Sequence, residues 1–414
     1  MKKIFIILFI FNYLHSFSQV SVEANPSYNI KSVAFVQNKL PVVPYFKLGE
    51  PFEFVFDDLY GNEANYYYVV NQYTYDWQPT ELVKQEYLKG MDNLRILNYQ
   101  NSFNTLQLYS HYSLLFPNVN TSITKSGNYM IAIYNEDQEL VFSRKFIIYE
   151  PLLGIKAEVK RSRTIETINT KQNLEFSITT SDFTIQNPMQ NIKVMITQNG
   201  RWDKVLYNIK PQYTLGNELL FRYNTETQFF GGNEMLYWDN KDIRLANNSI
   251  AKVTSGDVYN SFLFPTEGRA NVPYTYFPDL NGSFYPRNFL ATNHAIEADY
   301  SWVYFSLFAP YTTSDQKIFV AGMFSNYALT DEYQLEYNTK TGLYEKAILA
   351  KQGFTNFEYI LTNENNLPNF EQAPDGNFWQ TENNYFIFVY YKGNADRYDR
   401  VIGFGTANSE GIRN

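Results

Sequence analysis

The sequence predicts an all-β protein of about three tandem β-sandwich domains, of immunoglobulin-like or early-set type. Aromatic residues make up 18% of the 414-residue chain, with 36 tyrosines and 34 phenylalanines. Such side chains suit the pleated, half-buried surface of a sheet. Short runs in which apolar and polar residues alternate recur along the chain, while a helical period is almost absent. A chain of this length exceeds one hydrophobic core, so several domains are expected.

Residues 1–18 have the features of a secretory signal peptide. Lys2 and Lys3 give a basic start, residues 4–11 form an apolar run, and residues 16–18 supply a small-x-small cleavage pattern. The apolar run is shorter than the roughly 20 residues that a membrane-spanning helix requires. We therefore expect an exported protein that is soluble after cleavage.

The composition excludes several classes of function. The formal net charge of −8 provides no basic field, so a nucleic-acid partner is not expected. Cysteine is absent, which excludes disulfides, a thiolate nucleophile, Cys-ligated zinc and the lipid anchor of bacterial lipoproteins. Stability must therefore come from hydrophobic burial.

Residues 19–150 predict a first immunoglobulin-like sandwich. Strands are expected at residues 52–56, 66–70, 73–77, 126–134 and 140–149, the last two forming a closing hairpin. Trp77 is a candidate core tryptophan, and Tyr129 has the position of a tyrosine corner. One short helical patch, at residues 81–89, does not change the predicted class.

Residues 151–299 predict a second sandwich with long loops. Pro151 marks the boundary, because the alternating pattern stops there and then restarts as a new series. Strands are expected at residues 174–178, 192–196 and 219–223, separated by Asn, Gly and Pro turns. Repeated Pro and Gly between Phe262 and Pro286 predict ordered loop and short edge strands.

Residues 300–414 predict a third sandwich. Its expected segments are residues 302–307, 318–327, 342–349 and 353–359. In order and spacing they resemble the early-set sandwich of starch- and glycogen-binding modules. Tyr327 and Tyr344 stand where those modules usually place the tryptophans of a sugar platform, so a carbohydrate ligand stays open as an alternative.

Three motifs spread over the chain carry a wider resemblance. They are NTETQFFGGNE at residues 224–234 with Trp238 and Asp239 following, DLNGSF at residues 279–284, and GLY at residues 342–344 leading to GF at residues 353–354. In their order, the chain resembles the plug protein family of the bacterial type IX secretion system, found in Bacteroidetes-type bacteria. The likeness extends over nearly all of the chain after residue 18.

That resemblance implies a location, a partner and a role. Members of the family are periplasmic proteins associated with the outer membrane through a large β-barrel translocon. They bind the periplasmic mouth of this barrel and seal it while no substrate is passing. A barrel of that size encloses an aqueous channel, which makes the membrane leaky without a removable stopper.

No catalytic, cofactor or metal site is predicted. The chain has three histidines, and His15, His111 and His294 lie in unrelated segments, which argues against a metal site or a catalytic triad. Asp57 and Asp58 are adjacent, so on a strand they would face opposite sides, and a turn is the expected setting. The alternatives to a plug are a carbohydrate-binding envelope protein and a glycoside hydrolase built from carboxylates far apart in the chain.

Two segments are candidates for binding the translocon. The first follows a Phe-Phe pair and has glycines that permit a tight turn, although a turn that caps the second sandwich is the simpler explanation, and the second segment is the better candidate. The second combines aromatic side chains with proline, which lowers the entropy lost on docking. The candidate residues are Gly231, Gly232, Asn233 and Glu234 in the first segment, and Tyr274, Tyr276, Phe277, Phe284 and Tyr285 in the second.

Overall fold

The computed structural model describes residues 22–180, 183–310, 312–313 and 315–412. The expected signal peptide and His15 lie outside these residues. The described chain is all-β, as predicted. Its helices are α1 (Lys84–Tyr87), α2 (Pro188–Asn191), α3 (His294–Glu297) and the 3-10 helix η1 (Met323–Ser325). None of the helices in the described ranges has the length and apolar character needed to traverse a bilayer.

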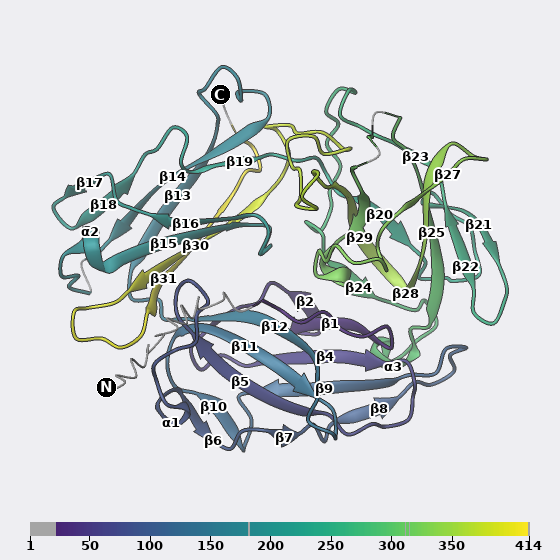
Figure 1. Ribbon diagram of the computed structural model, residues 1–414, viewed down its shortest axis with the longest axis horizontal. Helices are drawn as coiled ribbons and strands as arrows, with labels where there is room; N and C mark the ends of the chain where they lie inside the picture. Colours follow the sequence, from purple (N-terminus) through teal and green to yellow (C-terminus); the bar gives the residue numbers. More distant parts are fainter. Residues whose placement is uncertain (1–21, 181–182, 311, 314, 413–414) are drawn as a thin grey trace, which may run out of the picture.

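The first unit, residues 30–150, is a sandwich of two five-stranded sheets (Figure 1). One sheet runs in the order β2 (Leu40–Val42), β1 (Ile30–Gln37), β4 (Phe52–Asp58), β9 (Ser110–Phe116), β8 (Tyr99–Asn101). The other runs β3 (Tyr45–Lys47), β12 (Leu140–Tyr149), β11 (Gly127–Tyr134), β5 (Tyr67–Tyr73), β7 (Leu94–Arg95). A separate ribbon pairs β10 (Thr121–Ile123) with β6 (Leu88–Gly90).

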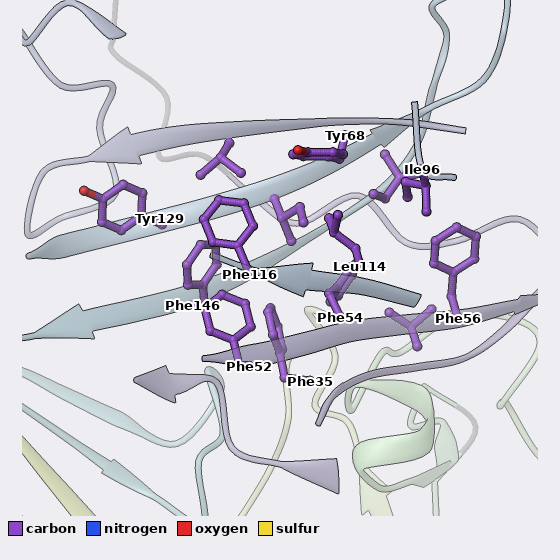
Figure 2. Close-up of a cluster of buried hydrophobic side chains, with 14 of the residues drawn as sticks. Phe35, Phe52, Phe54, Phe56, Tyr68, Ile96, Leu114, Phe116, Tyr129 and Phe146 are labelled. Carbon is purple, nitrogen blue, oxygen red and sulfur yellow. The ribbon is translucent and has the colours of Figure 1, made fainter. Parts of the chain in front are cut away.

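Aromatic side chains from both sheets fill the space between them (Figure 2). The rings of Phe46 and Phe52 stack with centroids 4.0 Å apart, and those of Phe56 and Tyr112 stack at 5.0 Å. Each such pair adds about 0.5–1.5 kcal/mol beyond the burial of its area. The high aromatic content of the sequence therefore serves the core here.

The predicted hairpin and tyrosine corner of the first unit are confirmed. Strands β11 and β12 pair antiparallel along their length. Tyr129 is fully buried, and its hydroxyl donates a hydrogen bond of 2.7 Å to the carbonyl oxygen of Lys125. This contact ties the start of β11 to the preceding loop.

Two local predictions in the first unit are wrong. Residues 73–77 were expected as a strand, but the chain turns after β5: the N–H of Trp77 donates to the carbonyl of Thr74 at 3.0 Å, and the φ of Trp77 is 60°. The Thr74 side chain accepts the N–H of Gln78 and stabilises this turn. Asp57 and Asp58, expected in a turn, end β4 and are fully buried.

The second unit joins two distant parts of the chain. Its first sheet runs β13 (Gly154–Arg161), β14 (Lys171–Thr179), β18 (Glu218–Phe221), β17 (Tyr213–Leu215), with β19 (Gln228–Phe230) also on β14. Its second sheet runs β16 (Val205–Ile209), β15 (Ile192–Gln198), β30 (Asn384–Tyr391), β31 (Arg400–Asn408). The last hairpin of the chain therefore completes a sandwich that began at β13.

The third unit lies between these two parts in sequence. One sheet runs β20 (Leu236–Asp239), β29 (Gly353–Leu361), β24 (Phe284–Pro286), with β26 (Ile318–Ala321) also on β29. The other runs β21 (Ile250–Thr254), β22 (Asn260–Leu263), β25 (Tyr300–Phe308), β28 (Leu343–Lys351), β27 (Glu336–Asn338), with β23 (Thr266–Glu267) on β25. Trp238 packs at its centre against Phe305 and Phe357.

The strand pairings correct the expected division of the chain at residues 151–299 and 300–414. Strands β20 to β24 were assigned to the second sandwich, but they pair within the third unit. Strands β30 and β31 were assigned to the third, but they pair with β15 of the second. Strand alternation is a local signal and carries no information about which distant strand fills an open edge.

Candidate functional site

The chain passes between the second and third units twice, and both passages lie together. The first passage, residues 231–235, leads from β19 to β20, and the return, residues 362–383, leads from β29 to β30. The N–H of Phe378 donates to the carbonyl of Gly232 at 2.8 Å, and the Asn383 amide donates to the carbonyl of Gly231 at 2.8 Å. We call these two paired passages the junction. It is a crossing between sandwiches and not a turn that caps one of them.

Close backbone approach explains the first glycine of the junction. A Cβ atom on Gly231 would lie 2.0 Å from the carbonyl oxygen of Phe378, which no side chain tolerates. Gly232 has a φ of 66°, a region that glycine adopts at no steric cost. The Gly-Gly pair therefore lets the two passages touch.

The Pro-rich segment predicted as a binding loop packs on the junction. Arg269 donates from Nε to Asp375 at 2.7 Å and from Nη2 to the carbonyl of Glu234 at 2.8 Å. The hydroxyl of Tyr274 donates to the carboxylate of Glu234, and its ring lies 5.7 Å from that of Phe378. The structure thus brings the two predicted segments into direct contact.

The aromatic residues of the Pro-rich segment differ in exposure. Tyr276 is 52% exposed, and its hydroxyl lies 3.3 Å from a carboxylate oxygen of Glu382. Phe277 is half-buried, with the guanidinium of Arg269 5.9 Å from its ring. Phe284 and Tyr285 belong to β24, where Phe284 is buried and Tyr285 half-buried, so Phe284 does not offer the surface expected of it. A hollow of about 580 Å³ adjoins the junction.

Burial changes the acid strength of two carboxyl groups at the junction. It raises the pKa of Glu234 to about 7, although hydrogen bonds from Tyr274 and from the N–H of Glu382 oppose the change. Burial also raises the pKa of Asp279 against the hydrogen bonds that it accepts from backbone N–H groups. Glu234 is therefore an acid that titrates near neutral pH at the point where two units meet.

A buried ionic cluster joins the first and third units. The carboxylate of Asp57 accepts hydrogen bonds from Lys351 at 2.6 Å and from the Tyr300 hydroxyl at 2.5 Å, and Nδ1 of His111 lies 2.6 Å from it. Burial alone would raise the pKa of Asp57, but Lys351 and His111 outweigh it and hold the pKa below its usual value. Asp58 points the other way, toward Asn29 and Tyr66.

Arg201 also connects the second unit to the third. Arg201 is buried, pairs with Asp203 at 2.7 Å and with Glu358 of β29, and stacks 3.8 Å above the ring of Tyr327. The guanidinium covers one face of the Tyr327 ring, so that face is closed to a sugar ligand. Tyr344 instead packs against Tyr337, with ring centroids 5.1 Å apart.

The first and second units share an apolar seam. Its buried members are Tyr45, Tyr75, Ile147, Met195, Phe388, Tyr390 and Val401. The Tyr390 hydroxyl donates to Asn128 at 2.7 Å, and the N–H of Glu150 donates to the carbonyl of Val401 at 2.8 Å. Trp77 is buried beside Trp202 of the second unit, with ring centroids 5.2 Å apart.

The sequence alone does not indicate the contacts between units. Their partners lie up to several hundred residues apart, and a lone Asp, Lys or Arg has no pattern that marks it as paired. The described part of the chain holds no group of three or more His, Asp or Glu side chains arranged to bind a metal ion.

Two comparisons with known proteins give matches, one with family models and one with solved structures. A family model described as "Type 9 secretion system plug protein 1st domain" matches residues 30–150, which is the first unit. A crystal structure of a hypothetical protein from Parabacteroides merdae is similar along 93% of this chain and 98% of its own. The sequence identity is 30% and the TM-score 0.88. No curated protein matches the chain.

Proposed function

Because the chain belongs to the type IX secretion system plug protein family, we propose that it binds the periplasmic mouth of the large outer-membrane β-barrel translocon and seals it while idle. Membership itself gives the chain a role in type IX secretion, an association with that system and a place in the cell envelope. It also favours a structural role over catalysis. The plugging step, the periplasmic location and the identity of the partner are the proposal.

The observation that carries the proposal is the interlocking of the three units. Each pair of units shares a buried seam: the Asp57 cluster between the first and third, the Arg201–Glu358 contact between the second and third, and the apolar seam around Tyr390 between the first and second. A stopper has to keep its shape across a wide opening, and pre-formed seams avoid an ordering cost when it docks. Three sandwiches held this way present their loops in fixed positions.

The Pro-rich segment at the junction is the proposed contact with the barrel. Val272, Tyr276 and Leu280 expose their side chains there, while Arg269 and Tyr274 hold the segment against the junction beneath. The remaining candidates of this region, Gly231 to Glu234, support the loop from within. An exposed tyrosine on a fixed segment is typical of residues that dominate interface energies.

Replacing Tyr276 by serine tests this contact. We expect the affinity for the solubilised outer-membrane barrel to weaken about fivefold or more, because truncating an aromatic anchor usually costs more than about 1 kcal/mol. Cells with the variant should become more permeable to large antibiotics.

Tyr213→Ser is the matched control, because Tyr213 is 63% exposed on edge strand β17 of the second unit. It should leave both readouts unchanged. An equal loss of barrel binding in the two variants would show that any exposed tyrosine contributes through non-specific apolar contact. Unaltered binding of Tyr276→Ser would remove this segment from the interface, and a chain that captures no barrel at all would contradict the plug function.

A further inference from the structure

The three units meet around a cavity of about 350 Å³. In Figure 1 the first unit lies below, the second to the upper left and the third to the upper right of this meeting point. The lining includes Arg144 and Lys145 of the first unit, Trp202 of the second and Asn326 of the third. Every unit thus contributes to one central hollow.

The segment before β1 reaches into this cavity and binds the edge of β12. The N–H of Ala24 donates to the Ser143 hydroxyl at 2.8 Å, and the N–H of Ser143 donates to the carbonyl of Ala24 at 3.1 Å. Strand β3 occupies the same edge further along, from Ile147 to Tyr149. Residues 23–24 therefore add a short extended piece where β3 does not reach.

Glu23 links two units through its carboxylate. One oxygen accepts the backbone N–H of Lys145 at 2.5 Å, and the other accepts the side-chain amide of Asn326 at 2.7 Å. Lys145 belongs to the first unit and Asn326 to the third. The carboxylate is a charged hydrogen-bond acceptor, and such bonds are about twice as strong as neutral ones.

The surroundings of Glu23 are cationic and incompletely neutralised. Arg144 is 7% exposed and donates to the carbonyls of Ala24 and Ser143, at 3.3 and 2.8 Å. The ammonium of Lys145 lies 4.4 Å above the ring of Trp77. No carboxylate among the described residues forms a salt bridge with either cation. Burial lowers the pKa of Arg144 and of Lys145, and Glu23 opposes that change.

The segment that carries Glu23 is held at few points. Val22 is 79% exposed, and Asn25, Ser27 and Tyr28 are also exposed. Between Ala24 and Asn29 the chain makes no strand contact. A ligand that offers the same carboxylate and the same backbone groups would replace these contacts one for one.

We propose that the position now held by residues 23–24, at the Ser143 edge of β12 beside the central cavity, is a binding site for an extended acidic peptide segment. Glu23 occupies this site in the free chain, and the peptide displaces it. Recognition would combine strand addition at Ser143 with capture of a carboxylate between Lys145 and Asn326. The site is separate from the Pro-rich contact segment and does not depend on the plug function.

The test uses a labelled octapeptide with the sequence of residues 22–29, VEANPSYN, and a second peptide with Gln in place of Glu. Binding is measured to the full-length chain and to its Glu23→Gln variant. We expect the variant to bind the acidic peptide roughly ten- to a hundredfold more tightly than the unaltered chain, because the internal competitor has lost its charge-assisted bonds. The Gln peptide should bind the variant far more weakly.

Glu332→Gln is the matched control. Glu332 also bridges the first and third units, through Lys31 at 2.5 Å, but it does not bind the Ser143 edge. This variant should bind the acidic peptide no better than the unaltered chain. Equal affinity of the unaltered and Glu23→Gln chains, or an equal gain in Glu332→Gln, would overturn the proposal.

Hydrogen exchange on the unaltered chain gives a second readout that does not rely on a variant. Excess acidic peptide should expose the N–H of Ala24, while the N–H of Ser143 stays protected by the incoming strand. The Gln peptide should change neither. If the Ala24 amide keeps its protection at saturating acidic peptide, the segment is a permanent part of the fold and the proposal fails.

Discussion

At the scale of single residues, Asp57 holds the buried contact between the first and third units. It is fully buried at the end of β4 and gathers Lys351, Tyr300 and His111 around one carboxylate. A buried pair contributes little net stability relative to an apolar replacement, but removing one partner leaves an uncompensated charge. Asp57 therefore fixes how the first and third units fit together.

Asp57→Asn should lower the free energy of unfolding by about 3–5 kcal/mol in urea titrations, because Lys351 is left buried without a counter-charge. The folded-state pKa of Asp57 lies below the ordinary 3.8, so its contribution is present above about pH 4 and is lost as the pH falls further. The gap between variant and unaltered chain should therefore narrow in acid.

The double variant Asp57→Asn/Lys351→Met should recover part of the loss, since it removes both charges. Asp137→Asn, at an exposed position in the β11–β12 turn, should change stability by less than about 0.5 kcal/mol. If Asp57→Asn also changed the free energy of unfolding by less than about 0.5 kcal/mol, the cluster would not hold the two units together.

At the scale of elements, the junction brings two passages of the chain into close contact around a buried carboxyl group. Gly231 allows the passages to touch, and Glu234 accepts the Tyr274 hydroxyl and the Glu382 N–H. Because its pKa is about 7 in the folded chain and 4.5 in a free Glu, the folded chain binds the proton of Glu234 more tightly than the unfolded chain does. Stability from this group is complete below about pH 4.5, the pKa of a free Glu, and is lost as the pH rises through about 7.

Glu234→Gln removes this pH dependence, because glutamine keeps the accepting oxygen and never ionises. Relative to the unaltered chain, the variant should gain about 1–3 kcal/mol of unfolding free energy between about pH 5 and pH 8. Glu371→Gln, on an exposed residue of the return passage, should show no such gain. A constant difference between the Glu234 variant and the unaltered chain across this range would refute the assignment.

At the scale of the whole molecule, the last hairpin closes two structures at once. Its side chains Ile387, Val389 and Ile402 belong to the core of the second unit. Phe388, Tyr390 and Val401 face the apolar seam with the first unit. One hairpin thus completes a core and an interface with its two faces.

A chain ending after Glu382, which lacks β30 and β31, should lose the second unit while keeping the first. All strands of the first unit come from residues 30–149, so limited proteolysis should leave a fragment of that region and digest residues 154–230. A chain ending after Ser409 retains the hairpin and should resist like the full chain. Protection of residues 154–230 in the shorter chain would contradict this dependence.

The sequence predicts local structure in this protein far better than the connections between parts. Alternation located strands such as β11 and β25, and position alone indicated the corner of Tyr129. The same signal could not show that β30 pairs with β15, because an edge strand accepts any partner with matching faces. Nor could it pair Asp57 with Lys351. In the candidate site, the aromatic and Pro content indicated a fixed loop. The contacts of Glu234 and Arg269 that hold this loop could not be predicted, because they form only where the third unit is inserted into the second.

The position of the third unit within the second also sets the order in which the units can be completed as the chain emerges from synthesis or from export. Because the chain emerges from its N-terminus, the first unit has all its strands before the others begin. Strand β15, ending at Gln198, then waits with one open edge until β30 emerges from Asn384 onward. The third unit, whose last strand ends at Leu361, is complete earlier. The second unit therefore assembles last, and a chain cut short anywhere before the hairpin displays an unpaired, apolar strand that marks it as unfinished.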